Sequence, residues 1–425
     1  MLFVFLNQFY VPDVAPTGRH LHQLSRVMVN RGHQVQVLCS RRSYNGSKTF
    51  ASREVIDGVE VVRLPATGFG RRGRLGKVAD YASFYCSLLA ALMGRFRNRP
   101  DVILSLTTPP YVGILGKLGA WRHRCRHADW IMDLYPDVMF AHGMAQSSGI
   151  VPRVLKSLTR VQLKGARPIF TLGPVMEKSV AHYVGGYSGS SPITSVPLWS
   201  DAELQPWSEQ EPNSLRNDRG WSAKDVVFLY SGNMGLGHRF HEFLEAANRL
   251  GTSGPLWAFA GGGARKQEVE LKVKTLTNAR IQLFDYAPQS QLRAHLCAAD
   301  VHLASLEPAW QGFMVPSKVQ TSFSVARPVI YVGGRHCETA IWIQESGGGW
   351  VVDTGDVSGL LRAVQEACSP DIRRSRGQAA LDFARKHFDR DIGCTRMAEL
   401  LEHNAEMTRS SLVGAQCSGQ LVASD

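Results

Sequence analysis

The cysteines of this chain form no recognisable ligand set or disulfide framework. Eight cysteines are scattered singly through the 425 residues, with no C-x-x-C pair and no histidine partners at zinc-ligand spacing. This scatter argues against a zinc ribbon and against a small disulfide-stapled scaffold. It favours a protein that works in a reducing compartment.

Long apolar runs are also missing. No run reaches the roughly 18 residues that a membrane-spanning helix needs. The closest, residues 81–94, is interrupted by Ser83 and Ser87, so we expect a core or interfacial helix there. The first residues, MLFVFLNQF, lack a basic segment and a small-residue cleavage site, and we expect a buried strand rather than a signal peptide.

Acidic residues are in deficit. The chain has 48 Lys and Arg against 36 Asp and Glu, which gives a formal net charge of +12. This balance points to an anionic partner, which could be a nucleotide phosphate, a lipid diphosphate, an acidic membrane surface or a nucleic acid. Nucleic acid is disfavoured, because the basic residues do not interleave with aromatic stacking platforms.

Buried-strand patterns alternate with amphipathic-helix patterns in two separate stretches. The first begins with a strand over residues 2–6, a helix from Gly18 and a strand over 35–38, and the second begins with a strand over 226–230. Pro16-Thr17-Gly18 opens the first helix, and this is not a G-x-G-x-x-G dinucleotide fingerprint. The fold class predicted is therefore α/β, with two doubly wound Rossmann-like domains.

Composition sets the domain boundaries. Residues 187–219 are rich in Ser, Gly, Pro and Asn and show little periodicity. We predict an N-terminal domain over residues 1–195, a linker over 196–224 and a C-terminal domain over 225–388. A helix follows over 389–407, and the Ser-, Ala- and Gly-rich tail over 408–425 is predicted to be disordered.

The stretch over residues 303–333 has the pattern of an anion cradle. An apolar strand leads into a glycine-containing loop, and a helix is expected to open at Val315, Pro316, Ser317 and Lys318, with proline at its first position. Unpaired N–H groups at a helix start favour phosphate. Lys318 adds a full positive charge.

Asp133 follows a predicted strand over residues 129–132, where a functional acid would be placed. A carboxylate there can equally cap the following helix, and the sequence leaves both alternatives open. Farther upstream, Asp57-Gly58 predicts a tight hairpin turn.

Basic clusters flank the apolar stretch over residues 81–94. The sequence allows a solvated surface beside a core helix, or an interfacial helix resting on anionic lipid. The cations concerned are Arg71, Arg72, Arg74 and Lys77 before it and Arg95, Arg97 and Arg99 after it.

Seven short motifs, taken in order, resemble retaining GT-B glycosyltransferases of family 4, and among them bacterial enzymes that assemble colanic acid, capsule or O-antigen units. They span the chain to about residue 406. The motifs are Pro16-Thr17-Gly18, Arg31-Gly32-His33-Gln34-Val35, Asp133-Leu134-Tyr135-Pro136, Ser231-Gly232-Asn233-Met234-Gly235, Gly261-Gly262-Gly263, Ala299-Asp300-Val301 and Val315-Pro316-Ser317-Lys318.

The resemblance implies a nucleotide-diphosphate sugar donor bound mainly by the C-terminal domain, and a lipid-linked or saccharide acceptor bound mainly by the N-terminal domain. It implies no metal and no cofactor, a cytoplasmic protein that can work at the inner face of the membrane, and a C-terminal helix that crosses back to the N-terminal domain. The catalytic residues expected are Asp133, Arg239 and Lys318. The donor-binding residues expected are Gly18, Gly232, Asn233, Gly262, Val315, Pro316, Ser317 and Thr321.

The sequence departs from the family pattern at two places. Asn233 stands where one diphosphate-binding cation is usual, with His238-Arg239 at the other, and the family's paired glutamates fall at Phe313 and Thr321. One alternative is therefore a catalytically weakened GT-B protein that binds a nucleotide sugar or a partner transferase. A second, a sugar-nucleotide epimerase, is disfavoured because no carboxylate pair occurs at the donor loop.

Overall fold

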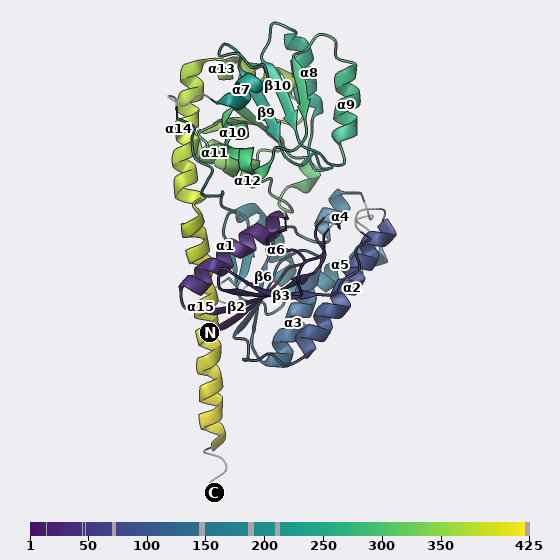
Figure 1. Cartoon of the computed structure of the whole chain (residues 1–425), viewed down its shortest axis with the longest axis vertical. Helices are drawn as coiled ribbons and strands as arrows, with labels where there is room; N and C mark the ends of the chain where they lie inside the picture. The colour runs from purple at the N-terminus through teal and green to yellow at the C-terminus, as the bar shows by residue number, and fades with distance from the viewer. Residues whose placement is uncertain are drawn as a thin grey trace. The chain divides into compact units, whose positions relative to one another are not determined.

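The chain folds into two compact units (Figure 1). The computed structural model describes residues 1–13, 15–44, 46, 48–69, 74–143, 149–185, 191–208 and 213–420. Unit 1 comprises Met1–Pro136, Gln146–Val196 and Asp391–Asp425, and unit 2 comprises Asp137–Ala145 and Pro197–Arg390.

Unit 1 is built on a largely parallel sheet in the order β3-β4-β2-β1-β5-β6-β7-β8, in which only the β3–β4 pair is antiparallel among the described strands. The central strand β1 is buried from Phe3 to Leu6 because helices cover both faces of a parallel sheet. Its strands are β1 (Leu2–Leu6), β2 (Gln34–Ser40), β3 (Arg53–Ile56), β4 (Val59–Leu64), β5 (Val102–Ser105), β6 (Arg126–Trp130), β7 (Ile169–Thr171) and β8 (Ile193–Ser195). Its helices are α1 (Pro16–Asn30), α2 (Arg74–Met93), α3 (Val112–His123), α5 (Ile150–Leu163), α6 (Pro174–Val184) and α15 (Arg390–Gln420).

Unit 2 is built on a parallel sheet in the order β11-β10-β9-β12-β13-β14. Phe228 and Tyr230 of β9 and Trp257 and Phe259 of β10 are buried in one core cluster beneath α8 and α13. Its strands are β9 (Val227–Ser231), β10 (Leu256–Ala260), β11 (Ile281–Phe284), β12 (Val301–Ser305), β13 (Val329–Val332) and β14 (Gly349–Val352). Its helices are α4 (Asp137–Ala141), α7 (Ser214–Asp218), α8 (His241–Leu250), α9 (Lys266–Lys274), η1 (Gln289–Gln291), α10 (Leu292–Cys297), η2 (Pro308–Trp310), α11 (Lys318–Ser324), α12 (Glu338–Ser346), α13 (Val357–Ala367) and α14 (Pro370–His387).

These two sheets confirm the predicted fold class, with a doubly wound parallel sheet in each unit. The predicted hairpin is confirmed as well: β3 and β4 pair across Asp57 and Gly58, whose φ angles of 49° and 79° suit a turn with two left-handed residues. Among the described residues, no helix combines the length and the apolarity needed to cross a membrane.

The stretches predicted as a linker and as a tail contain helical segments. The stretch predicted as a linker, 196–224, lies mostly in unit 2 and contains α7. The helix predicted over 389–407 is part of α15, which continues to Gln420 through most of the predicted disordered tail. Most of α15 is grouped with unit 1 and packs there, through the pair of Arg31 with Glu402 and the pair of Asp101 with Arg409.

Candidate functional site

Two glycine loops in unit 2 meet at the carboxyl ends of β9 and β10. Gly232 N–H donates to the Ala260 carbonyl at 2.9 Å, and Met234 N–H donates to the Gly262 carbonyl at 2.7 Å. The contact is so close that a Cβ added at Gly261 would lie 2.0 Å from the Gly232 oxygen. The glycines therefore allow backbone to pack on backbone at the strand ends, where ligands bind in open α/β sheets.

Lys318 lies beside these two glycine loops, next to Gly232. It is the first residue of α11, and its Nζ is 4.7 Å from the centre of the Tyr230 ring and 3.3 Å from His238 Nε2. Burial lowers the pKa of Lys318 to about 7. In the part of the chain that the structure describes, no carboxylate forms an ion pair with this amine, so a bound anion can stabilise its charged form.

His238 fixes the position of that ammonium. Its Nδ1 lies 2.7 Å from the Ser305 carbonyl oxygen, which can only accept, so Nδ1 carries the proton and Nε2 accepts from Lys318. Burial lowers the pKa of His238 to about 3, so the ring is neutral at physiological pH. The sequence placed His238 beside Arg239 at the diphosphate position but did not indicate its contact with Lys318, because the two residues are 80 positions apart.

Arg239 is bound by carboxylates. Its Nη2 lies 2.6 Å from Glu242 Oε1 and its Nη1 lies 2.7 Å from Glu307 Oε2, while Arg265 also approaches Glu307 at 3.4 Å. Glu242 is fully buried, so the Arg239 guanidinium compensates a carboxylate that water cannot reach. The predicted diphosphate-binding role of Arg239 has to compete with this ion pairing.

The loop before α11 differs from its prediction. The helix begins at Lys318, with Ser317 as the N-cap residue, so Pro316 lies in the preceding loop and not at the first helical position. Val315 and Pro316 are buried, and the Thr321 hydroxyl donates to the Lys318 carbonyl at 3.0 Å. With only seven residues, α11 contributes a weak dipole, and the charge of Lys318 dominates this end of the sheet.

The glycine loops also position Asn233, another predicted donor-binding residue. A Cβ at Gly263 would lie 2.5 Å from Asn233 Oδ1, so this side chain is held against the second loop. Tyr286 donates its hydroxyl to the Gly262 carbonyl at 2.9 Å. The structure therefore brings Gly232, Asn233, Gly262 and Lys318 together in unit 2.

The predicted residues Asp133 and Gly18 belong to unit 1. Burial raises the pKa of Asp133 to about 6, and its backbone N–H donates to Thr107 Oγ1 at 3.4 Å. No hydrogen bond to the Asp133 carboxylate occurs among the described residues, so helix capping gains no support. At Gly18, α1 approaches the loop after β1: a Cβ there would lie 2.8 Å from the Phe9 carbonyl oxygen.

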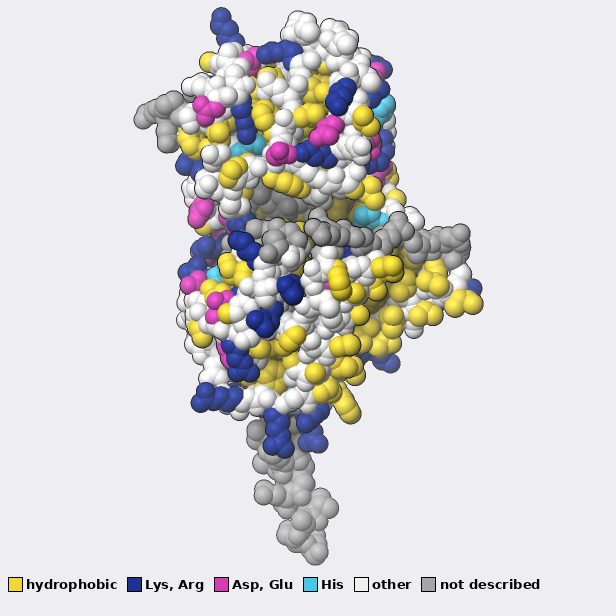
Figure 2. All heavy atoms as spheres, turned by 45° about the vertical axis from the view of Figure 1, so that its right-hand side comes forward, with side chains coloured by type: hydrophobic (Ala, Val, Ile, Leu, Met, Phe, Trp, Pro, Cys, Tyr) yellow, Lys and Arg dark blue, Asp and Glu magenta, His cyan; other side chains and the backbone are white. Residues whose placement is uncertain are grey.

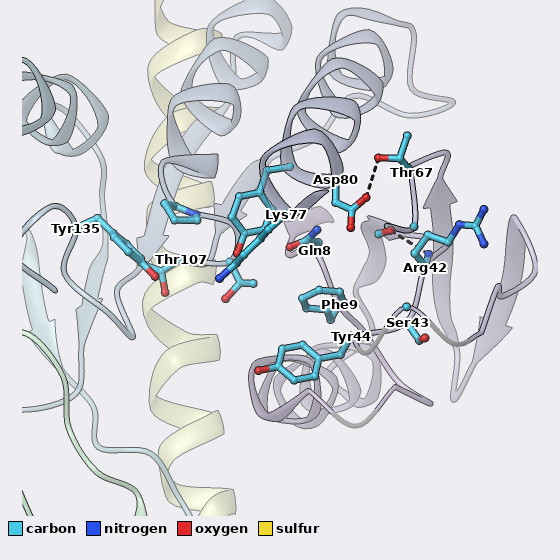
Figure 3. Close-up of a pocket in the computed structure, with 16 residues that line it drawn as sticks. Gln8, Phe9, Arg42, Ser43, Tyr44, Thr67, Lys77, Asp80, Thr107 and Tyr135 are labelled. Atoms are coloured by element: carbon cyan, nitrogen blue, oxygen red, sulfur yellow. Dashed lines mark hydrogen bonds between the residues drawn. The ribbon is translucent and has the colours of Figure 1, made fainter. Parts of the chain in front are cut away.

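A cavity of about 200 Å³ opens at the carboxyl ends of the unit 1 strands (Figure 3). Arg42 lies on its wall, and its guanidinium donates only to neutral acceptors among the described residues, Thr49 Oγ1 at 2.7 Å and the Ala66 carbonyl at 3.4 Å. Asp80 accepts from Thr67 Oγ1 at 2.8 Å. The lining also includes Gln8, Phe9, Tyr44, Lys77, Tyr81, Thr107 and Tyr135.

This mixture of aromatic rings, hydroxyls and cations suits a polar ligand with an anionic part. The sequence did not single out Arg42. The available signal was its position directly after β2, next to the other strand ends.

Among the described residues, no group of three or more His, Cys, Asp or Glu side chains is arranged to hold a metal ion.

The chain is similar in sequence to known glycosyltransferases. Residues 17–199 match the model of the glycosyl transferase 4-like domain. The probable glycosyltransferase WbjE of Pseudomonas aeruginosa is 25% identical over 314 residues, which cover 74% of this chain and 76% of that protein. The putative colanic acid biosynthesis glycosyl transferase WcaI of Escherichia coli (strain K12) is 23% identical over 404 residues, or 90% of this chain and 95% of that one.

Solved structures share the fold. WaaG, a glycosyltransferase involved in lipopolysaccharide biosynthesis, superposes with a TM-score of 0.67 at 16% identity, covering 94% of this chain and 99% of its own. Anabaena HepE in complex with UDP-glucose gives a TM-score of 0.68 at 13% identity, covering 95% and 100%. The predicted resemblance to GT-B glycosyltransferases is thereby confirmed: residues 17–199 match the glycosyl transferase 4-like domain, and the chain shares the GT-B fold of these solved structures.

Proposed function

We propose that this protein transfers a sugar from a nucleotide-diphosphate donor, with retention and without a metal, to a lipid-linked or saccharide acceptor in cell-surface polysaccharide assembly. The names of WcaI and WaaG support the polysaccharide context, and HepE binds UDP-glucose on the same fold. We place the reaction in the cytoplasm, at the inner face of the membrane.

One observation carries the donor assignment: the Lys318 ammonium lies beside the glycine loops, and no carboxylate in the described chain pairs with it. A diphosphate there would accept from Lys318 and from backbone N–H groups of the glycine loops. Gly232, Asn233, Gly262, Val315, Pro316, Ser317 and Thr321 would line the donor, as the family resemblance implies. We also propose that Gly18, in unit 1, contacts the donor, as the family resemblance implies.

The chemistry that follows needs no protein nucleophile. As the bond between sugar and diphosphate breaks, negative charge grows on the leaving phosphate, and the Lys318 ammonium stabilises it. The acceptor hydroxyl attacks on the same face and passes its proton to that phosphate. His238 contributes by holding the lysine through a neutral Nε2.

The acceptor is proposed to enter the unit 1 cavity. Tyr44, Tyr81 and Tyr135 can pack against sugar rings, and Arg42 can pair with an anionic group because no carboxylate in the described chain holds its guanidinium. A sugar diphosphate carried on a lipid would satisfy both features.

Asp133 is proposed to act near the reacting centre on the acceptor side. We expect Asp133→Asn to lower the turnover number at least ~10-fold, as the loss of a group that orients the acceptor hydroxyl does, while donor affinity stays nearly unchanged. Titration of the donor into the variant supplies the control. Collapse of donor binding would instead show that Asp133 has a structural role.

A panel of UDP-, GDP-, ADP- and dTDP-hexoses tests the activity as a whole. The proposal predicts nucleotide release that depends on an added saccharide or polyprenyl-diphosphate acceptor and falls in Lys318→Ala. Tight binding of a nucleotide sugar without release under any acceptor would assign the chain to the non-catalytic alternative.

A further inference from the structure

Helix α5 of unit 1 has a second apolar face that the core does not bury. Its inward side is formed by Pro152, Thr159, Gln162 and Leu163. On the outward side, five apolar side chains are between 36% and 77% exposed. At 3.6 residues per turn these five share an arc of about 100°. They are Ile150, Val151, Val154, Leu158 and Val161, and together we call them the α5 arc.

The neighbouring helix extends this surface. Helix α3 packs against α5, and it exposes 77% of Trp121 and 42% of Leu118. Figure 2 shows hydrophobic side chains gathered in one field over the helices of unit 1. Single exposed apolar residues are ordinary, but a contiguous field of this kind marks an interaction surface. An exposed tryptophan on the helix packed against α5 is typical of a membrane interface.

The charges of these helices have one sign. Helix α5 contains Arg153, Lys156 and Arg160, α3 contains Lys117 and Arg122, and neither helix contains an Asp or a Glu. Arg153 and Arg160 are exposed and border the α5 arc on one side. No carboxylate forms an ion pair with either of them in the described part of the chain. A purely protein partner would not require this acid-free basic border, whereas anionic phospholipid headgroups would pair with it.

We propose that the α5 arc, together with Trp121 and Leu118, docks unit 1 on an anionic phospholipid bilayer. The apolar side chains enter the boundary between headgroups and acyl chains, and Arg153 and Arg160 contact the headgroups. The sequence placed lipid contact elsewhere, at the cations flanking α2, of which Arg71 and Arg72 lie outside the described residues. The inference does not depend on the proposed activity.

Sedimentation of the full chain with vesicles tests this surface. One set of vesicles contains phosphatidylcholine alone, and the other contains phosphatidylcholine mixed with phosphatidylglycerol. We expect binding to the anionic set at low salt, weakened by high salt, and at least ~10-fold lower partitioning for Val154→Asp combined with Val161→Asp. Leu271→Asp is the matched control, because Leu271 of α9 is 57% exposed, close to the 52% of Val154.

A second pair of variants tests the charges. Arg153→Gln combined with Arg160→Gln should weaken binding to anionic vesicles and leave binding to neutral vesicles unchanged, while Lys224→Gln in unit 2 should change neither. If circular dichroism shows that the aspartate variants unfold at a lower temperature than the wild type, these glutamine variants test the proposal in their place.

Three results would overturn the proposal. The first is equal binding to neutral and anionic vesicles at low salt. The second is unchanged partitioning of a folded Val154→Asp, Val161→Asp variant. The third is a wild-type dimer in light scattering that the same variant converts to monomer, which would assign the α5 arc to a second copy of the chain.

Discussion

Arg239 and Lys318 are both cations at the strand ends of unit 2, yet their surroundings give them different roles. Arg239 contacts two carboxylates, whereas Lys318 contacts a neutral imidazole and an aromatic ring. A cation whose charge is already compensated gains less from a phosphate than one whose charge is open. We therefore assign donor binding to Lys318 first.

Arg239→Ala should act mainly on stability. Removal of the guanidinium leaves buried Glu242 without a cation and with only the Gly355 N–H as donor, which costs about 3 kcal/mol or more in the free energy of unfolding. Arg249→Ala on α8, the helix that carries Glu242, is the matched control, because its pair with Glu245 is largely exposed and contributes about 0.5 kcal/mol or less. Urea unfolding measures both. An Arg239→Ala protein as stable as Arg249→Ala would contradict the structural role.

Asp129 is a buried acid whose protonation is linked to the stability of unit 1. It is fully buried, accepts from Gln162 Nε2 at 3.0 Å, and burial raises its pKa to about 8. Between the ordinary pKa of 3.8 and the folded value of about 8, the folded protein keeps a proton on Asp129 that the unfolded chain has released. Stability therefore falls as pH rises, by up to about 1.4 kcal/mol per unit, until pH passes about 8.

Asp129→Asn removes that titration and keeps an oxygen acceptor for Gln162. We expect its unfolding temperature to drop less than that of the wild type between pH 5 and pH 8, when both are followed by circular dichroism. Parallel curves for the two proteins would show that Asp129 is already ionised in the folded state.

At the scale of elements, α15 is held to unit 1 by a three-residue cluster. Glu402 accepts from Arg31 at 2.7 Å and lies 2.6 Å from His33 Nε2. The Arg31 guanidinium, followed by His33, lowers the pKa of Glu402 to about 2. Because the folded pKa is depressed, this contribution is complete above the ordinary value of 4.5 and is lost as pH falls toward 2.

Glu402→Gln should therefore destabilise unit 1 at pH 7 by about 1 to 2 kcal/mol, given one charged bidentate pair at a partly exposed site. The difference from wild type should shrink below pH 4.5. Glu399→Gln, exposed on the same helix, is the control: Glu399 acts on Arg31 only through its charge, without a hydrogen bond, so its loss should change stability less than the loss of Glu402. A constant difference at every pH would mean that packing, and not charge, anchors the helix.

At the scale of the whole molecule, the predictable parts are those encoded locally. Strands such as Leu256–Ala260 and the Asp57-Gly58 turn follow from short runs whose apolar pattern and turn residues agree. Contacts between residues far apart in the sequence could not be predicted. The pairing of Arg239 with Glu307 spans 68 positions, and no periodicity reports it.

The exposed face of α5 illustrates the same limit. Its sequence is apolar over most of its turns, which predicts a helix but not which side the core covers. The unit 1 cavity likewise arises from several strand ends at once, so Arg42 becomes a candidate only when β2 is placed beside β1 and β4.

The most direct test of the donor assignment is proton uptake on binding of the nucleotide sugar that the hexose panel selects. Free Lys318 has a pKa of about 7, and a bound diphosphate favours its charged form. Calorimetry at pH 8 in buffers of different ionisation enthalpy should therefore show uptake of a fraction of a proton, since His238, with a pKa of about 3, does not titrate there. Lys318→Ala should lose this uptake and bind about 10- to 150-fold more weakly, the equivalent of a charge-assisted contact of about 1.5 to 3 kcal/mol. Lys318→Arg should bind without uptake. Unchanged affinity and unchanged proton uptake in Lys318→Ala would contradict the account.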